Sequence, residues 1–190
     1  AAARSIEANV LLVRAGALYH DIGKIVNPQC FTENEAAGVR YHADLTPKES
    51  AQEIIRHVSD GLNLAEKNGL PDVIRDFIRT HHGTTSTGYF LTKYLNDGGD
   101  PEDVSEFYYN GMKPVTKEQV ILMICDAVEA ASRSLKDYSQ ASISALVEKI
   151  VAGKDAEGQL DNADISLKEI NIVLNLTVAS LYFGCAELKL

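Results

Sequence analysis

The sequence has no tryptophan, few cysteines and no long apolar run. The three cysteines, Cys30, Cys125 and Cys185, lie far apart and form no Cys-x-x-Cys pair, which argues against a structural zinc site. Their odd number indicates reduced thiols in a cytosolic setting. No stretch matches the roughly 18 apolar residues of a membrane-spanning helix, and no signal peptide is recognisable, so we expect this chain itself to be soluble.

Basic side chains are also scarce, with 18 lysines and arginines against 27 aspartates and glutamates and a net charge of -9. This balance argues against binding to polymeric nucleic acid, which requires many phosphates to be neutralised. The negative net charge does not exclude a small phosphorylated ligand, because bound divalent cations would offset the negative charge locally. The length and the apolar content of 45% are typical of one well-buried domain, which we expect to span residues 1–190.

Apolar residues recur at helical spacing along the chain, and no segment alternates convincingly as a strand does. Capping boxes predict helix starts at Thr46, Thr116 and Ser166. Gly69 and Gly153 are expected to end two of the helices. Other helices are predicted over 6–20, 71–82, 84–96 and 141–152, with long irregular segments at 26–46 and 97–115. We therefore expect an all-α protein, an orthogonal bundle of six or seven helices.

The segment Tyr19–Ile25 places a histidine and an aspartate side by side at the end of the first apolar helix. Adjacent residues on a helix point about 100° apart, so His20 and Asp21 can bind one metal ion only where the helix ends. Gly23 is expected to supply the bend in the backbone. Lys24 follows directly, either as a contact to phosphate or as an ordinary surface lysine.

Four of the five histidines and one aspartate are explained together if they converge on metal. His57 falls in the middle of the helix after Thr46, and His81 and His82 close the next helix. Asp126 lies inside an apolar run, where an ionised carboxylate costs several kcal/mol, roughly, unless it is paired or metal-bound. Imidazole and carboxylate ligands suit Fe, Mn, Zn or Ni.

Each histidine also has a purely structural interpretation. His57 shares a helix face with Ile54 and Leu64 and could be an ordinary core residue. The pair His81 and His82 could instead interact with the helix dipole at the C-terminal end. His42 matches no ligand position in this pattern. It is expected to be solvated, and a contact to phosphate is the alternative.

The order His-Asp, His, His-His, Asp resembles the HD superfamily of metal-dependent phosphohydrolases. The local sequences Tyr-His-Asp-Ile-Gly-Lys at 19–24, His-His-Gly-Thr-Thr at 81–85 and Asp-Ala-Val-Glu-Ala-Ala at 126–131 are more narrowly similar to one group. That group is the cytosolic HD domain of seven-transmembrane HD proteins, which are cyclic di-AMP phosphodiesterases. The resemblance covers nearly the whole chain.

This resemblance implies a phosphodiesterase that opens cyclic di-AMP to the linear dinucleotide with a metal-activated hydroxide. Two divalent transition-metal ions are expected, and the resemblance implies iron or manganese. Asp21 is the candidate to bridge the ions, and Lys24 is expected to hold a phosphate or assist the leaving oxygen, with Thr84 and Thr85 as further substrate contacts. The candidate metal ligands are His20, Asp21, His57, His81, His82 and Asp126.

The chain departs from the family pattern at its start. The family carries a further metal-binding histidine on a helix before the His-Asp doublet, whereas this chain begins nineteen residues before His20. We therefore expect a single HD domain that lacks the first helix. The resemblance also implies a parent protein anchored in the inner or plasma membrane by segments outside this chain, with this domain cytoplasmic. The final helices, rich in Ile and Leu, could cover the core or make a homodimer.

Three other functions remain open. The related HD-GYP group hydrolyses cyclic di-GMP and shares His-Asp-Ile-Gly-Lys, but it has glutamate where Gly83 follows His82 here. A different nucleotide phosphohydrolase is the second alternative. The third is a sensor that binds the nucleotide without turnover. Substrate competition separates the enzymes, and binding without product formation identifies the sensor.

Overall fold

The computed structural model describes residues 1–34 and 40–187, with side chains as far as Tyr182. Within these residues every regular element is helical, apart from one isolated bridge between Ser86 and Tyr108. The α-helices are α1 (Ala2–Ser5), α2 (Val10–Tyr19), α3 (Pro47–Lys67), α4 (Asp72–Thr80), α5 (Gly88–Asn96), α6 (Lys117–Ser132), α7 (Gln140–Ala156) and α8 (Leu167–Glu187). Short 3-10 helices are η1 (Ile22–Ile25), η2 (Pro28–Cys30), η3 (Thr32–Asn34) and η4 (Ser105–Phe107). The all-α prediction is confirmed, and the single turn α1 adds one helix to those expected.

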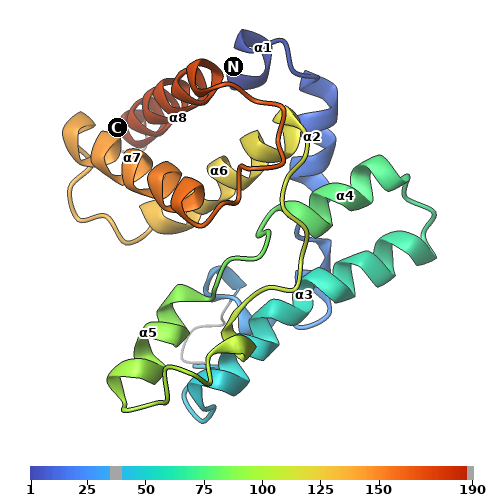
Figure 1. Cartoon of the computed structure of the whole chain (residues 1–190), viewed down its shortest axis with the longest axis vertical. Coiled ribbons are helices and arrows are strands. Elements are labelled where there is room, and N and C mark those ends of the chain that lie inside the picture. Colours follow the sequence, from blue (N-terminus) through green and yellow to red (C-terminus); the bar gives the residue numbers. More distant parts are fainter. Residues whose placement is uncertain (35–39, 188–190) are drawn as a thin grey trace. The chain divides into compact units, whose positions relative to one another are not determined.

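The helices gather into two compact units, which are described separately (Figure 1). One unit comprises residues 1–16 and 113–190, and the other comprises residues 17–112. The expectation of a single domain over residues 1–190 stays a prediction. None of the described helices combines the length and the apolar character that crossing a bilayer requires.

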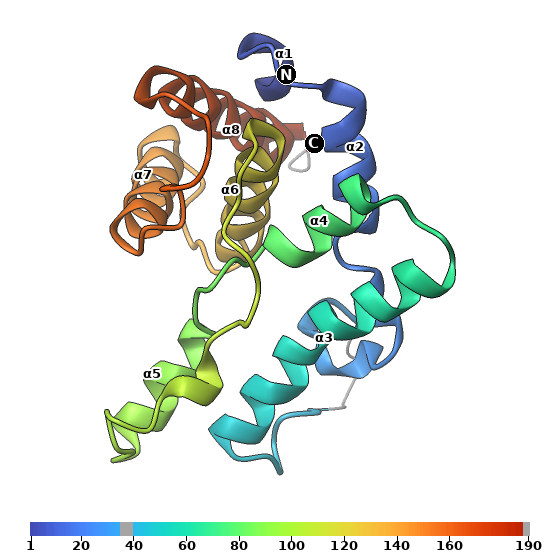
Figure 2. The ribbon, with the colours of Figure 1, turned by 45° about the vertical axis from the view of Figure 1, so that its right-hand side comes forward.

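In the unit of residues 1–16 and 113–190, α7 packs against both α6 and α8 (Figure 2). The single turn α1 also packs on α6 and α8. Helix α6 is buried continuously from Gln119 to Ile124, which agrees with the apolar run in the sequence. Asp126 follows this run and is half-buried.

Helix α3 organises the unit of residues 17–112, because η1, α4, α5 and η4 all pack against it. Its buried positions include Ala51, His57 and Gly61, which fall on one face at helical spacing. Phe90 and Phe107 pack around Ala51 and form a small apolar cluster. The same face therefore carries an apolar cluster in its first turns and a buried histidine in its middle.

The helix starts predicted from capping boxes at Thr46, Thr116 and Ser166 are confirmed. The hydroxyl of Thr46 accepts a hydrogen bond from the Glu49 N–H at 3.2 Å, while the Glu49 carboxylate accepts one from the Thr46 N–H at 2.8 Å. Thr116 forms the equivalent capping box with Gln119 at the start of α6. These caps satisfy backbone donors that have no partner inside a helix, so each fixes where its helix begins.

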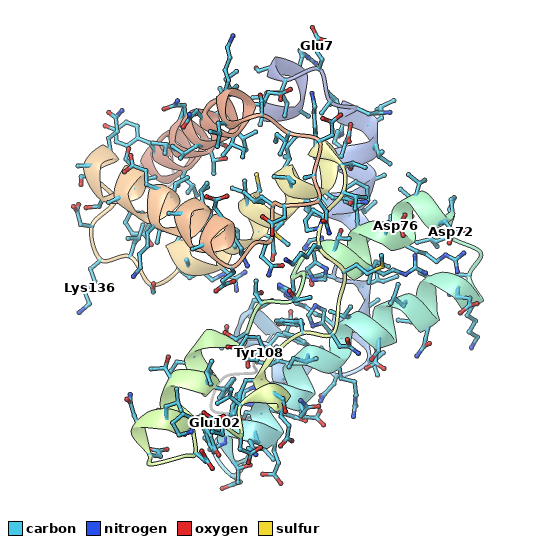
Figure 3. The ribbon with its side chains drawn as sticks, viewed as in Figure 1. Glu7, Asp72, Asp76, Glu102, Tyr108 and Lys136 are labelled. Carbon is cyan, nitrogen blue, oxygen red and sulfur yellow. The ribbon has the colours of Figure 1, made fainter. Side chains whose placement is uncertain are left out.

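Helix α4 is amphipathic. On its exposed side Asp72 pairs with Arg75 and Asp76 pairs with Arg79, each at 2.6 Å (Figure 3). Phe77 is buried on the other side. This pattern determines which face of α4 turns toward α3, and hence the direction in which the C-terminal end of α4 presents its side chains.

Three predicted helix boundaries are wrong. The helix expected over 6–20 begins only at Val10, as α2, and the single turn α1 precedes it. Helix α7 continues through Gly153 to Ala156, and the left-handed residue that ends the turn is Gly158, with φ +65°. Helix α5 begins at Gly88 rather than residue 84. The preceding residues instead form extended backbone, because the Thr87 N–H donates to the Phe107 carbonyl at 2.8 Å and the Tyr109 N–H donates to the Thr85 carbonyl at 2.9 Å.

Glycine is required at position 23 because of a close approach between backbones, and not because of the backbone bend that the sequence suggested. Its φ is not positive, so it does not exploit a backbone conformation reserved for glycine. An added Cβ would instead lie 1.8 Å from the His57 carbonyl oxygen and 2.5 Å from the Gly61 backbone nitrogen. Glycine therefore allows η1 to touch the backbone of α3, and this contact brings the His20-Asp21 doublet close to His57.

Replacing Gly23 with alanine tests this contact. We expect Gly23→Ala to lower the free energy of unfolding by about 3 kcal/mol or more, because the obstructing atoms belong to backbone and cannot rotate away. Urea denaturation measures the loss. Gly88→Ala is the matched control, since a Cβ there meets no atom within 4 Å. Equal unfolding free energies for the two variants would contradict the account.

Candidate metal centre

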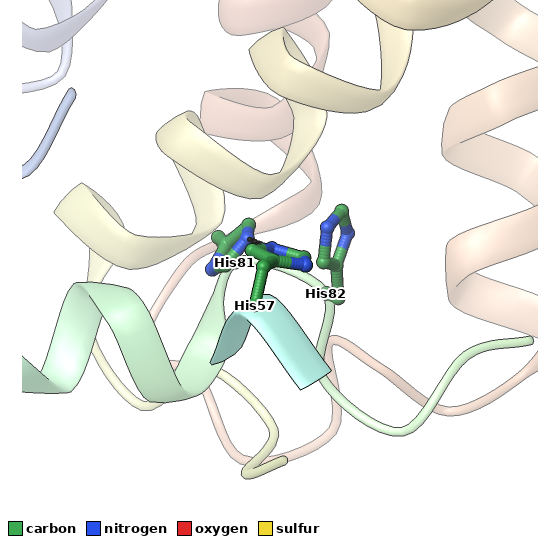
Figure 4. Close-up of side chains that lie close together, drawn as sticks. All are labelled: His57, His81 and His82. Carbon is green, nitrogen blue, oxygen red and sulfur yellow. Dashed lines mark hydrogen bonds between the residues drawn. The ribbon is translucent and has the colours of Figure 1, made fainter. Parts of the chain in front are cut away.

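Five candidate ligands converge within the unit of residues 17–112. His57 projects from the middle of α3, His81 caps the C-terminal end of α4, and His82 follows it. Figure 4 shows the rings of these three residues close together. His20 and Asp21 come from the junction between α2 and η1, and the His20 and His81 ring centroids are 5.0 Å apart.

Backbone carbonyls orient three of the imidazoles through their Nδ1 atoms. The Nδ1 atoms of His20, His57 and His81 lie 2.9, 2.6 and 2.9 Å from the carbonyl oxygens of Ala17, Ile54 and Ile78, respectively. In each case the carbonyl belongs to the residue three positions earlier. A carbonyl oxygen only accepts, so each Nδ1 carries a proton, and in the neutral form of the ring the Nε2 atom presents a lone pair. This is the usual arrangement for histidines that bind metal through Nε2.

The Nε2 atoms of His57 and His81 face each other at 3.0 Å. Both side chains are buried, with exposed fractions of 3% and 1%. At this distance the two atoms can share a hydrogen bond only if one Nε2 also carries a proton; when both rings are neutral with Nδ1 protonated, two lone pairs face each other, which is unfavourable in a buried site. A cation that accepts both lone pairs removes the conflict, so this pair fits a metal ion.

Asp21 supplies the negative charge of the cluster. Its Oδ1 lies 3.4 Å from His57 Nε2 and 3.7 Å from His81 Nε2, and its Oδ2 lies 2.8 Å from Lys24 Nζ. Burial by itself raises the pKa of Asp21, but the hydrogen bond and charge of His20, together with the charge of Lys24, hold that pKa well below its usual range. The carboxylate is therefore ionised at neutral pH and available to a metal.

The Oδ1 atom of Asp21 is buried and makes no hydrogen bond to any part of the chain that the structure describes. A buried carboxylate oxygen normally has a donor, because losing its hydration is costly. The neighbouring Nε2 atoms of His57 and His81 are acceptors as well when these rings are neutral. A metal ion bound by this oxygen and the two histidines would satisfy all three groups.

Lys24 lies between two carboxylates at the edge of the cluster. Its Nζ is 2.8 Å from Asp21 Oδ2 and 2.8 Å from Glu33 Oε1, and it lies 4.9 Å from the centre of the Phe31 ring. Burial lowers the pKa of Lys24, but the two carboxylates more than offset this and raise it. The Phe31 ring stands edge-on to His57, with centroids 5.6 Å apart. The cationic group is thus fixed next to the histidines.

The remaining candidates are placed as follows. Asp126 lies on α6 in the other unit, so its role as a ligand stays a prediction. Thr84 is exposed, whereas Thr85 is buried and donates its hydroxyl to the His82 carbonyl at 2.8 Å. Substrate contacts by either threonine also stay predictions. His42 is half-buried rather than solvated, and its Nε2 lies 2.8 Å from the Cys30 carbonyl oxygen.

The sequence analysis missed Tyr109. Its ring stacks on His82, with centroids 4.2 Å apart and an angle of 25° between the planes. The residue lies in the segment expected to be an irregular loop, and one tyrosine beside another gives no sequence signal for such a contact. Only the pairing of this segment with Thr85 and Thr87 reveals it.

Residues 1–131 match the HD domain family. The chain belongs to this family. The cyclic-di-AMP phosphodiesterase PgpH of Listeria monocytogenes is 39% identical to this chain over 181 residues, and the PgpH of Bacillus subtilis is 37% identical to it over 181 residues. Each alignment covers 95% of this chain and 25% of the relative, so the chain spans about a quarter of the length of these relatives.

Solved structures agree with these sequence relationships. The HD domain of L. monocytogenes PgpH has a TM-score of 0.86 to this chain, and the same domain in complex with cyclic-di-AMP has a TM-score of 0.89. Both are 39% identical and cover 95% of this chain and 84% of the solved one. The resemblance seen in the sequence motifs is therefore confirmed, and with it the all-α HD fold.

A metal-dependent change in thermal stability tests the centre. After chelation and dialysis, added Mn²⁺ is expected to raise the melting temperature of the chain. At a Mn²⁺ concentration 100 times the dissociation constant, one bound ion adds about 2.7 kcal/mol to the free energy of unfolding. His57→Gln should lose most of this shift, because it removes a ligand from the centre of the cluster. His42→Gln is the matched control and should keep it. Equal shifts in the two variants would contradict metal binding at His57.

Proposed function

We propose that this domain is a metal-dependent phosphodiesterase that hydrolyses a cyclic dinucleotide, namely cyclic di-AMP, to the linear dinucleotide. The observation that carries the proposal is the convergence of His57, His81 and Asp21 in one cluster, where the two Nε2 atoms lie 3.0 Å apart and Asp21 Oδ1 lies 3.4 and 3.7 Å from them. The likeness to a domain solved with cyclic-di-AMP supports the choice of substrate.

The proposed centre holds two divalent ions, either iron or manganese. The proposed ligands are His20, Asp21, His57, His81, His82 and Asp126, with Asp21 in the bridging position. Such ions polarise phosphoryl oxygens and lower the pKa of a coordinated water, which is the chemistry that phosphodiester hydrolysis requires. Nitrogen and carboxylate donors without thiolates suit iron and manganese better than a structural zinc.

The residues around the ions have separate proposed roles. Asp21 stays ionised at neutral pH. Its carboxylate could therefore bind the metal cations next to the reacting phosphate and accept hydrogen bonds from neighbouring donors. Lys24 carries a positive charge fixed beside Asp21, where it can contact a phosphate oxygen or the leaving oxygen. The edge of the Phe31 ring covers His57 and limits the access of water to that side of the cluster.

Two further proposals concern the whole protein. The relatives are about four times as long as the aligned segment, which is compatible with a cytoplasmic domain carried by a membrane-anchored parent. Self-association of the domain as a homodimer is proposed from its Ile- and Leu-rich final helix. Neither property is required for the metal chemistry.

Product analysis tests the proposed reaction. The manganese-loaded chain is expected to convert cyclic di-AMP to the linear dinucleotide, as measured by chromatography, and to turn it over faster than cyclic di-GMP. Asp21→Asn should lower the rate about 10³-fold, because several kcal/mol of charge stabilisation is lost. Asp97→Asn, an exposed site at the end of α5, is the control. Nucleotide binding without any product would instead identify a sensor and overturn the proposal that the domain is an enzyme.

The role of Lys24 can be tested separately. Lys24→Met keeps most of the side-chain length but removes the charge, and we expect kcat/KM for cyclic di-AMP to fall about 10²-fold. Lys93→Met, on the exposed face of α5, should leave kcat/KM unchanged. Steady-state kinetics at saturating Mn²⁺ makes the comparison. Wild-type kcat/KM in Lys24→Met would show that this residue is only a surface lysine.

A further inference from the structure

Tyr109 faces the histidine cluster from the segment after η4. Its side chain is 8% exposed, whereas that of the neighbouring Tyr108 is 45% exposed (Figure 3 labels Tyr108). The Tyr109 ring stacks on His82, and its centroid lies 6.1 Å from that of His57 in an edge-on arrangement. One of two adjacent tyrosines is thus turned toward the proposed metal ligands and the other toward solvent.

The backbone of the Tyr109 segment is fixed against the turn that carries His82. The Tyr109 N–H donates to the Thr85 carbonyl at 2.9 Å, and the Met112 N–H donates to the Arg79 carbonyl at 3.0 Å. Between them, a Cβ added to Gly111 would lie 2.5 Å from the Gly83 carbonyl oxygen. The segment therefore packs directly on the turn, and the position of the Tyr109 ring follows from backbone contacts on both sides.

We propose that Tyr109 is a positioning residue that sets the plane of the His82 imidazole for binding a divalent transition-metal ion. This inference rests on the proposed function, because it assumes that His82 is a ligand. Backbone carbonyls set the orientation of His57 and His81. A stacked ring acts differently, because it restricts the tilt of the imidazole plane. Hydrogen-bonding groups that orient metal ligands typically contribute about 10-fold to 100-fold to metal affinity, and we expect an effect of the same order from the stacked ring.

The stacked geometry also indicates which property of Tyr109 matters. The contact is between ring faces, 25° from parallel, so the stacking itself is supplied by the aromatic ring, which phenylalanine also has. Tyr109→Phe should therefore preserve metal affinity. Tyr109→Leu keeps an apolar side chain in the buried site but removes the flat face. The pair of variants separates stacking from simple burial.

Mn²⁺ titration by calorimetry tests the inference. Tyr109→Leu is expected to weaken Mn²⁺ binding about 10-fold to 100-fold, Tyr109→Phe should bind as wild type does, and Tyr108→Leu is the matched control at the exposed neighbour. A double-mutant cycle supplies the decisive comparison: in a His82→Gln background, Tyr109→Leu should cost no further affinity, because its effect passes through His82. If Tyr109→Leu lowers the metal-free melting temperature, Tyr109→Met replaces it in the same cycle.

Each result has a definite meaning. Equal losses from Tyr109→Leu with and without His82 would overturn the inference, because Tyr109 would then act on the fold in general. Wild-type affinity in Tyr109→Leu would also overturn it, while metal binding by the wild-type chain would leave the proposed function standing. A wild-type chain that binds no Mn²⁺ would overturn both.

Discussion

The arrangement of the site depends on two imidazole nitrogens and one carboxylate oxygen that meet in a buried space. His57 Nε2 and His81 Nε2 are 3.0 Å apart, and Asp21 Oδ1 lies 3.4 and 3.7 Å from them. When both imidazoles are neutral, these three atoms are all acceptors, and a positive charge among them stabilises the arrangement. The fold holds each of them by backbone contacts, so they cannot separate to relieve the conflict.

The backbone contacts that hold the cluster come from three separate segments. Helix α3 supplies His57 and its Ile54 carbonyl, and the end of α4 supplies His81 in the same way. The close approach of Gly23 to α3 brings Asp21 to them. A change in the backbone of any one segment would move its metal ligand out of place, even though the ligand residue itself is unchanged. The pre-organisation of the centre is therefore a property of backbone packing as much as of the ligands.

The sequence was sufficient for the features that arise from local patterns. Capping at Thr46 and Thr116 predicted the helix starts, and the position of His57 among core residues predicted its inward face. Residue types and their order also identified the HD family, which the comparisons confirm. These features depend on residues close together in the chain, or on side-chain chemistry alone.

Features that depend on distant backbone segments could not be predicted in this way. The role of Gly23 is set by α3, more than thirty positions later in the chain. The start of α5 at Gly88, and the stacking of Tyr109 on His82, both follow from the pairing of 85–87 with 107–109. Helix α7 likewise passes through Gly153, because a glycine near a helix end permits termination without requiring it.

The most direct test of the account is a crystal structure of the manganese-loaded chain with anomalous diffraction data collected at the manganese edge. The account predicts two anomalous peaks about 3.5 to 4 Å apart. One of them should lie within about 2.5 Å of both His57 Nε2 and His81 Nε2. The absence of a peak between these two nitrogens, with manganese bound elsewhere or not at all, would contradict the central claim that the histidine cluster is a metal centre.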